Sequence, residues 1–286
     1  MKTILLPTDF AMHSEKAMEF AIQIAAQANA RVIVMHSFVL YGTDAYVPSD
    51  MMTDMYQEEK EHSEKALMAY CQKISLQKSR NGQSIQTEYI SRQNFAASEI
   101  LSIIPEKNID LIIMGVEHAS QVSEILGSIT MEVVHKAKCP VLFVQESSRL
   151  RPFKEIYAAL EDVKQDLPAI FPVIYLAKLF HAALTVVHVN EQPADMADLR
   201  KNLRSKEAYE LLLNTLKEQY DYPNMTLNCC ASEESIALKI DELLIHNNPD
   251  MLVLVFKKRK WFDALFHKSV IRHLLSHADI PLLIIH

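Results

Sequence analysis

The sequence predicts an α/β protein made of two successive copies of one domain, each built around a parallel sheet. Short apolar runs alternate with helix-length segments, which is the cadence of strand–helix units in a parallel sheet. Segments of the first half also recur in the second: ARVIVMHSF at 30–38 as AALTVVHVN at 182–190, DLIIMGV at 110–116 as DMLVLVF at 250–256, and KCPVLFV at 138–144 as DIPLLII at 279–285. A repeat of about 140 residues indicates a duplicated domain.

The elements follow from the spacing of apolar residues along each copy. In the first copy the short apolar runs predict strands at 3–8, 31–37, 86–91, 110–115 and 140–145. Helices are predicted in the gaps, at 13–28, 52–79, 95–106 and 125–137. The second copy repeats the pattern, with strands at 155–160, 183–189, 225–230, 250–255 and 281–285 and helices at 166–181, 194–219, 233–246 and 262–277. Pro168 and Pro172 predict an irregular opening turn for the first helix of this copy.

We place the domains at 1–146 and 153–286, on either side of a polar junction that carries Pro152. Ala30 recurs 152 positions later, but Asp110 recurs only 140 positions later, so the first copy holds twelve additional residues between them. The sequence favours 40–52, LYGTDAYVPSDMM, as their place. That segment is either an ordinary surface insertion or a loop that covers a pocket or packs on a partner.

Composition excludes several classes of protein. A net charge of −7 and a pI near 5.9 argue against a nucleic-acid binder. No apolar run is long enough to span a membrane. Four cysteines without a CxxC motif predict reduced thiols in a cytoplasmic protein. The four glycines, at 42, 82, 115 and 127, exclude a GxGxxG fingerprint and a Walker A loop.

Two segments should meet where a parallel sheet binds its ligands, beyond the carboxyl ends of the strands. They are ILLPTDF, which ends the first strand, and the loop after the fourth strand, which begins at Gly115. Both resemble the universal stress protein family, whose members pair P-x-D with G-x2-G-x9-G-S, and many of which bind ATP. The resemblance covers nearly the whole chain. It implies two tandem Rossmann-like domains of the adenine nucleotide alpha hydrolase type, with strand order 3-2-1-4-5.

The resemblance also implies a site in the first domain. Pro7, Thr8 and Asp9 match the element that holds adenine and ribose, and Ser37 matches a backbone contact to the base. The phosphate loop and the start of the next helix match at Gly115, His118, Gly127, Ser128, Ile129 and Thr130. The implied cofactor is ATP, with Mg²⁺ as its companion ion. A carboxylate can accept ribose hydroxyls, and glycine amides at a helix N-terminus can hold phosphate.

The chain departs from the family pattern at the phosphates. His118 replaces the middle glycine of the motif. Only eight residues separate His118 from Gly127, where the family has nine between its second and third glycines. Glu117 adds a negative charge. In the second copy the matching positions carry side chains instead of the ligand-binding residues: Ala159, Leu160 and Glu161, and Val255, Lys258 and Lys268. We therefore expect ATP in the first domain only.

The functional prediction is a non-enzymatic stress-response protein that uses a bound nucleotide as a signal for partner binding. An interaction module with both sites empty is the alternative, and a slow ATPase would need Asp9 or Glu117 as its base. The resemblance implies that the two domains form an internal pseudo-dimer through strands near 141–144 and 282–285. A homodimer and a separate protein partner stay open, and no membrane association is expected.

Three weaker signals remain. The basic stretch FKKRKWF at 256–262 is either a solvated loop or a grip for an anion or an acidic partner. His273 and His277 have the spacing of two metal ligands but no supporting motif, so no metal site is predicted. A response-regulator reading fails because QTEYISRQN offers no aspartate at the end of the third strand.

Overall fold

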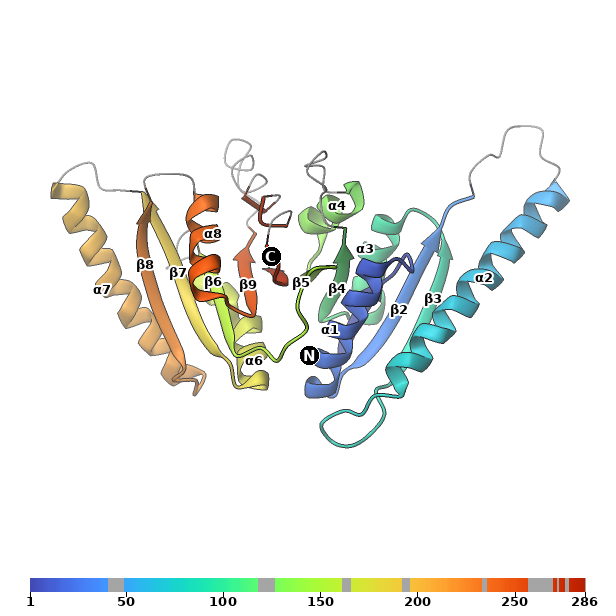
Figure 1. The fold of residues 1–286 in the computed structure, drawn as a ribbon, viewed down its shortest axis with the longest axis horizontal. Helices are drawn as coiled ribbons and strands as arrows, with labels where there is room; N and C mark the ends of the chain where they lie inside the picture. The colour runs from blue at the N-terminus through green and yellow to red at the C-terminus, as the bar shows by residue number, and fades with distance from the viewer. Residues whose placement is uncertain are drawn as a thin grey trace. The chain divides into compact units, whose positions relative to one another are not determined.

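The computed structural model describes residues 1–40, 49–117, 127–160, 166–191, 196–232, 236–256, 270–271, 273–275 and 278–285. These residues divide into two compact units, with the division in the polar junction between Glu146 and Ser147 (Figure 1). Each unit is an α/β domain, which confirms the predicted fold class. No helix in the described ranges is both long and apolar enough to cross a bilayer.

The first unit has five parallel strands in the order β3-β2-β1-β4-β5. Its strands are β1 (Thr3–Pro7), β2 (Arg31–Phe38), β3 (Thr87–Gln93), β4 (Leu111–Val116) and β5 (Val141–Gln145). Its helices are α1 (Met12–Ala28), α2 (Ser49–Ser75), α3 (Ala96–Lys107) and α4 (Ser128–Lys136). Helix α1 packs over β1, β4 and β5, α2 packs over β3 and β2, and α3 packs beside α4.

The second unit repeats this order as β8-β7-β6-β9-β10, again with parallel neighbours. Its strands are β6 (Glu155–Leu160), β7 (Ala183–Glu191), β8 (Met225–Ser232), β9 (Met251–Val255) and β10 (Leu282–Ile285). Its helices are α6 (Phe171–Phe180), α7 (Met196–Gln219) and α8 (Ile236–Asn247), with a short 3₁₀ turn, η1 (Leu167–Ile170), before α6. This turn confirms the irregular start predicted from the prolines. Of the predicted helix 262–277, the described residues at 270–271 and 273–275 are helical.

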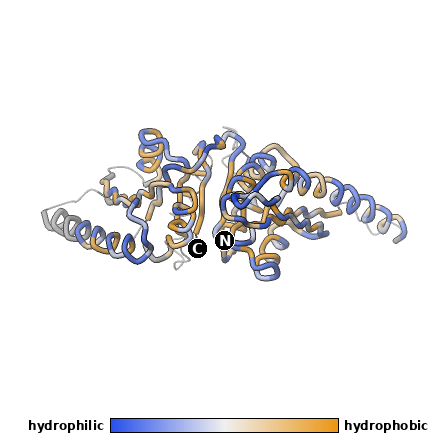
Figure 2. Tube along the Cα trace, turned by 90° about the horizontal axis from the view of Figure 1, so that it is seen from below, coloured by the Kyte–Doolittle hydropathy of each residue, from blue (hydrophilic) through white to orange (hydrophobic). Residues whose placement is uncertain are grey.

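Burial explains why these segments form a parallel sheet. β1 and β5 are buried along their whole length in the first unit, as is β10 in the second. Parallel strands with helices on their faces need such continuous apolar runs. Figure 2 shows hydrophobic residues gathered along the strands of each unit and many hydrophilic residues along the outer helices.

Matching aspartates tie the strands together in the same way in both units. Asp110 Oδ2 accepts hydrogen bonds from the backbone amides of Lys2, at 2.6 Å, and Thr3, at 3.0 Å. Asp250 Oδ2 accepts from the amides of Lys154, at 2.7 Å, and Glu155, at 2.8 Å. Each aspartate therefore joins the start of its fourth strand to the start of its first.

Matching histidines repeat a second contact. The His36 ring donates from Nδ1 to the carbonyl of Thr8 at 2.8 Å, and His188 does the same to Leu160 at 3.1 Å. Both units thus hold the end of their first strand to their second strand with one imidazole. Shared contacts of this kind support the duplication read from the sequence.

The additional residues of the first copy do not all lie where the sequence suggested. The connection from α2 to β3 spans eleven residues, 76–86, whereas five residues, 220–224, connect α7 to β8. Within the favoured segment 40–52, residues 49–52 belong to α2 and 41–48 lie outside the described residues. The connection from β2 to α2 is longer as well, ten residues (39–48) against four (192–195). The prediction of an insertion near 40–52 is therefore confirmed only in part, because a second loop of ordinary polar residues also lengthened.

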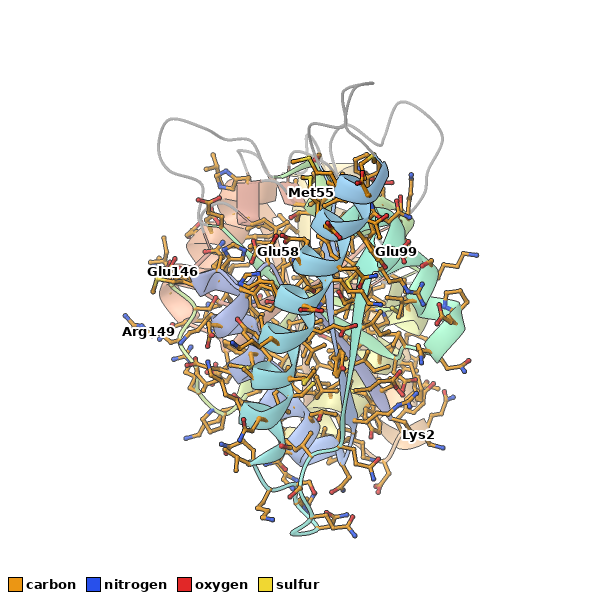
Figure 3. The ribbon with its side chains drawn as sticks, turned by 90° about the vertical axis from the view of Figure 1, so that its right-hand side faces the viewer. Lys2, Met55, Glu58, Glu99, Glu146 and Arg149 are labelled. Carbon is orange, nitrogen blue, oxygen red and sulfur yellow. The ribbon has the colours of Figure 1, made fainter. Side chains whose placement is uncertain are left out.

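Helix α2 is mostly solvent-facing in its first half. Met55 and Glu58 are exposed, and both lie on the outward side of the helix (Figure 3). Burial begins only near Ser63, whose hydroxyl lies 2.8 Å from that of Ser91 on β3. The half of α2 that reaches β3 therefore holds the helix to the sheet.

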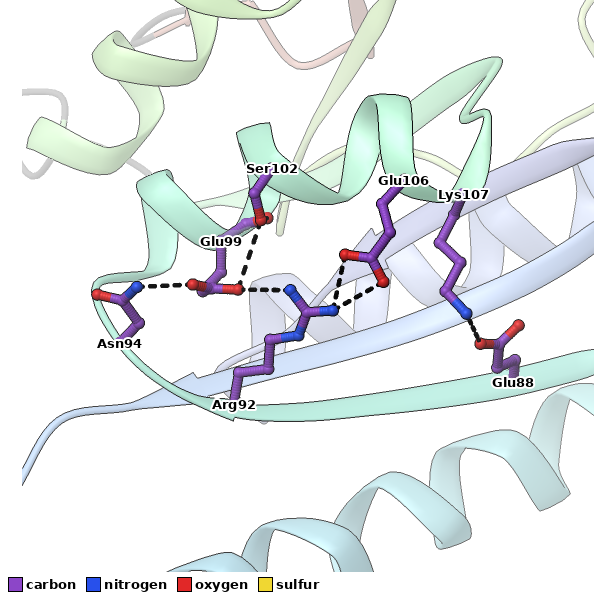
Figure 4. Close-up of polar contacts among 7 residues, drawn as sticks. All are labelled: Glu88, Arg92, Asn94, Glu99, Ser102, Glu106 and Lys107. Carbon is purple, nitrogen blue, oxygen red and sulfur yellow. Dashed lines mark hydrogen bonds and ion pairs between the residues drawn. The ribbon is translucent and has the colours of Figure 1, made fainter.

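A charged network joins β3 to α3 (Figure 4). Arg92 Nη1 donates to Glu99 at 3.0 Å, and its Nη2 donates to both oxygens of Glu106 at 2.8 Å. Glu99 is 8% exposed and also accepts from Asn94 Nδ2 at 2.6 Å. The network fixes α3 against the last strand on this side of the sheet.

We expect Arg92→Met to lower the free energy of unfolding of the first domain by about 1–2 kcal/mol, because it leaves the buried Glu99 carboxylate without its cation. The expected loss is no larger because the Arg92 side chain is 35% exposed, so water already screens part of its interaction with Glu99. Urea denaturation followed by hydrogen exchange in each domain measures the loss. Lys136→Met removes an exposed pair with Glu132 and serves as the control, with a change below about 0.5 kcal/mol. Equal effects of the two substitutions would contradict this role for Arg92.

Candidate functional site

The predicted site residues gather where the strand order of the first sheet reverses, between β1 and β4. Pro7 ends β1, and the buried Thr8 donates its amide to Met35 on β2 at 2.8 Å. Asp9 follows and is exposed. Because Pro7 pairs with Met35 at the end of β1, Ser37 lies at the same end of the sheet as Asp9. The structure thus brings Thr8, Asp9 and Ser37 to one end of the sheet.

The Asp9 carboxylate is held by the first turn of α1. Its Oδ1 accepts hydrogen bonds from Ser14 Oγ at 2.7 Å and from the amide of Ala11 at 3.1 Å. Its Oδ2 lies 3.1 Å from His13 Nε2. The side chain remains 58% exposed, so one side of the carboxylate stays available to a ligand.

Opposite charges shift both partners of this pair. The hydrogen bond from His13 holds the pKa of Asp9 well below its usual range, with further help from Ser14 and Ala11. The same bond raises the pKa of His13, and the negative charges of Glu117 and Glu146 raise it further. The charges that act on His13 are those of three carboxylates, which favour its protonated form.

We expect this pair to make stability depend on pH in two directions. The raised pKa of His13 gives a contribution that is complete below pH ~6.5 and is lost as the pH rises through the folded-state value. The lowered pKa of Asp9 gives a second contribution to the free energy of unfolding, which is lost as the pH falls below ~3.9. The effect should stay below about 1 kcal/mol because Asp9 is largely exposed. Thermal melts of His13→Gln and the unchanged protein at pH 5.5 and 9 test it. The difference in melting temperature should shrink at pH 9, and an equal difference at both values would contradict it.

The turn between β1 and α1 is rigid. Phe10 has a φ of 64°, and its amide donates to Thr8 Oγ1 at 2.9 Å. Its ring centroid lies 4.6 Å from that of His36 and 5.5 Å, edge to face, from that of Tyr70. Burial raises the pKa of Tyr70 to about 12, so its phenol stays neutral. These contacts fix the backbone that presents Asp9.

Packing requires a glycine at only one of the two glycine positions of the predicted phosphate loop. A Cβ on Gly115 would lie 2.3 Å from the carbonyl oxygen of His13, so this glycine allows α1 to approach β4. A Cβ on Gly127 would meet only Thr130 Oγ1, at 3.9 Å. Packing within the described residues therefore explains Gly115 but leaves Gly127 unexplained.

The remaining predicted residues lie at the start of α4. Gly127 precedes the helix, Ser128 and Ile129 are exposed, and Thr130 is buried. His118 lies outside the described residues. The exposed Glu117 follows β4 directly, at the same edge of the sheet as Asp9.

The equivalent position of the second unit is apolar. Leu160, which takes the place of Thr8, is 3% exposed, and Phe256, which takes the place of Val116, is 7% exposed. Val255 takes the place of Gly115. Glu161, Lys258 and Lys268 lie outside the described residues. At the described positions of this strand-order reversal, the second unit therefore lacks both the hydroxyl of Thr8 and the glycine that lets α1 approach β4.

Sequence reasoning missed His13, Ser14 and Glu146. An Asp followed four residues later by His at the start of a helix could have indicated the pair, because these positions face each other. Glu146 had no such signal, since only the register of β4 and β5 brings it near.

The other candidates acquire no ligand-binding role. His273 Nε2 pairs with Asp241 Oδ2 at 2.5 Å, and His277 lies outside the described residues. No group of three potential metal ligands occurs in the described part of the chain. Burial raises the pKa of both Cys229 and Cys230, so neither is an activated thiol.

Comparisons with known proteins agree with this architecture. A relative from Methanocaldococcus jannaschii, a universal stress protein, is 30% identical over 154 residues, covering 52% of this chain and 84% of that protein. A second universal stress protein, from Bacillus subtilis, is 27% identical over 154 residues, covering 50% of this chain and 97% of that protein. A solved universal stress protein of Archaeoglobus fulgidus has the same fold, with a TM-score of 0.74 and 21% sequence identity. The match covers 99% of this chain and 97% of that protein's chain.

The model of the universal stress protein family matches residues 1–145 and again 152–286. The chain therefore belongs to the universal stress protein family and carries two of its domains in tandem.

Proposed function

We propose that the first domain binds an adenine nucleotide at the carboxyl ends of β1 and β4 and that the second domain binds none. The observation that carries the proposal is the contrast between matching places. In the first domain Thr8 and Gly115 shape the turn that presents the Asp9 carboxylate, whereas the second domain has Leu160 and Val255 in their places. Ligands of open α/β sheets bind at such a reversal of strand order.

Each predicted residue has a role in this proposal. Asp9 accepts a ribose hydroxyl through the free side of its carboxylate, beside Pro7 and Thr8, and the backbone at Ser37 contacts the base. Amides near Gly127 and Ser128 hold phosphate at the N-terminus of α4, followed by Ile129 and Thr130. His118 belongs to the same loop, and Mg²⁺ accompanies ATP. Gly115 acts indirectly, by letting α1 place Asp9.

In this proposal the chain is a non-enzymatic stress-response protein of the cytoplasm, where its four free cysteines stay reduced. The bound nucleotide serves as a signal for association with a protein partner. Phosphate release from ATP should not exceed that of the buffer alone. An interaction module with no nucleotide in either domain is the competing function, and Glu117 favours it because a carboxylate repels phosphate.

Asp9→Asn tests the site. The amide keeps an oxygen that can accept from Ser14 and Ala11, so the turn survives, but the charge that accepts a ribose hydroxyl is lost. Asp9→Ala is a poorer choice, because it also removes the hydrogen bonds that start α1. We expect Asp9→Asn to weaken nucleotide binding at least ~10-fold in calorimetric titrations with and without Mg²⁺. Asp54→Asn on α2 is the exposed control. Unchanged affinity in Asp9→Asn would remove the assignment.

We also propose that residues 1–146 and 153–286 form an internal pseudo-dimer through β5 and β10. Within its own domain, each of these strands pairs on one side only, β5 with β4 and β10 with β9. An unpaired edge of apolar residues invites pairing. The outward amides of both strands should then exchange hydrogen as slowly as those of β1, and rapid exchange at either edge would contradict the pairing.

A further inference from the structure

We infer that the site of the first domain selects uncharged adenine nucleosides over nucleotides that carry several phosphates, so that adenosine binds more tightly than ATP. The inference rests on the proposed adenine site and names its ligand class. It follows from the charges that the sheet brings to this edge.

Three neighbouring strands each end in a carboxylate. Asp9 follows β1, Glu117 follows β4 and Glu146 follows β5, and these strands are adjacent in the order β1-β4-β5. Val116 lies beside Gln145 in the register, so Glu117 and Glu146 are the next pair along two parallel strands. Neighbouring strands lie about 4.8 Å apart. Both glutamates are exposed at this edge.

The imidazole of His13 faces these carboxylates and is already engaged. His13 Nε2 pairs with Asp9 Oδ2 at 3.1 Å, and the neighbouring groups that act on its charge are all acidic: Asp9, Glu117 and Glu146. The close approach of α1 to β4 at Gly115 holds His13 in this position. Three carboxylates against one imidazole leave the described part of this edge net negative, whether or not the ring is protonated.

The N-terminus of α4 opposes this charge only in part. A helix N-terminus favours an anion about 2–5-fold. One unit charge about 6 Å from a phosphate, at an effective dielectric near 40, disfavours it about 10-fold. The net negative charge therefore outweighs the helix. A ribose hydroxyl meets no such penalty, because it donates to the partly free carboxylate of Asp9.

Calorimetric titration of the full chain with adenosine, AMP and ATP tests the inference, each with and without Mg²⁺. Adenosine should bind at least ~10-fold more tightly than ATP without Mg²⁺, with AMP between them. Mg²⁺ should narrow the difference without reversing it. Tighter binding of ATP under either condition would overturn the selectivity while leaving the adenine site in place. No binding of any of the three would overturn the proposed function, and this inference with it.

A double substitution separates charge from shape. Glu117→Gln with Glu146→Gln removes two negative charges, so it should raise the affinity for ATP at least ~10-fold and leave that for adenosine unchanged. Glu58→Gln on the outward side of α2 is the matched control, and neither affinity should change (Figure 3). If the double variant leaves ATP affinity unaltered, the two glutamates do not set the ligand class.

Discussion

Gly115→Val should destabilise the first domain by about 3 kcal/mol or more and loosen the turn that presents Asp9. A Cβ at this position would lie 2.3 Å from the carbonyl oxygen of His13, 2.5 Å from its carbonyl carbon and 2.8 Å from the amide nitrogen of Ser14. All three are backbone atoms of the first turn of α1, so no rotamer change can relieve the clash. The helix must move away from β4, and Asp9 then loses its partners. Urea denaturation and hydrogen exchange in α1 measure both effects.

Two substitutions serve as controls for this result. Gly127→Ala places its Cβ in ordinary contact with Thr130 Oγ1, at 3.9 Å, and at a φ of −52°, so the free energy of unfolding should change by no more than about 0.5 kcal/mol. Val255→Gly in the second domain removes a half-buried side chain and should cost about 1 kcal/mol. Normal stability of Gly115→Val would show that α1 does not depend on this glycine.

The two domains also differ at the place of Gly115 in the fourth strand. A Cβ on Gly115 would meet the backbone of His13 and Ser14, whereas the second domain carries the side chain of Val255 at the matching position.

The sheet could be predicted from sequence because its information is local. Buried parallel strands such as β1 and β5 are continuous apolar runs, and the duplicated segments supplied each assignment twice. The strand order came from the family resemblance, not from the runs themselves. The added residues of the first copy were placed only in part, because residues 76–86 carry the same polar composition as any connecting loop.

The candidate site was predicted only in part, for a physical reason. A motif names side chains one at a time, whereas the state of Asp9 depends on His13 and Ser14, which reach it only after the chain turns at Phe10. The proximity of Glu117 and Glu146 depends on strand register, which no short motif carries. Gly115 was assigned to phosphate by resemblance, yet the close helix already requires it.

Asp250→Ala should lower the free energy of unfolding of the second domain by about 2–4 kcal/mol. Asp250 is 8% exposed, and its Oδ2 accepts from the amides of Lys154 and Glu155. Its Oδ1 forms an ion pair with Arg151, which also donates to the carbonyl of Pro249 at 2.9 Å. The substitution removes the acceptor of two backbone amides and the carboxylate that pairs with Arg151 Nε. Urea denaturation with domain-resolved hydrogen exchange gives the loss.

Asp110→Ala is the control that the duplication supplies. Asp110 accepts from the matching amides of Lys2 and Thr3, but it is exposed, so water can replace it. We expect a loss of about 1–2 kcal/mol, confined to the first domain. The amount by which the loss in Asp250→Ala exceeds the loss in Asp110→Ala measures the burial of Asp250 and its ion pair with Arg151 together. Arg151→Met should reproduce part of that difference. Equal losses at Asp110 and Asp250 would mean that the two backbone hydrogen bonds carry the whole effect and that the ion pair contributes nothing.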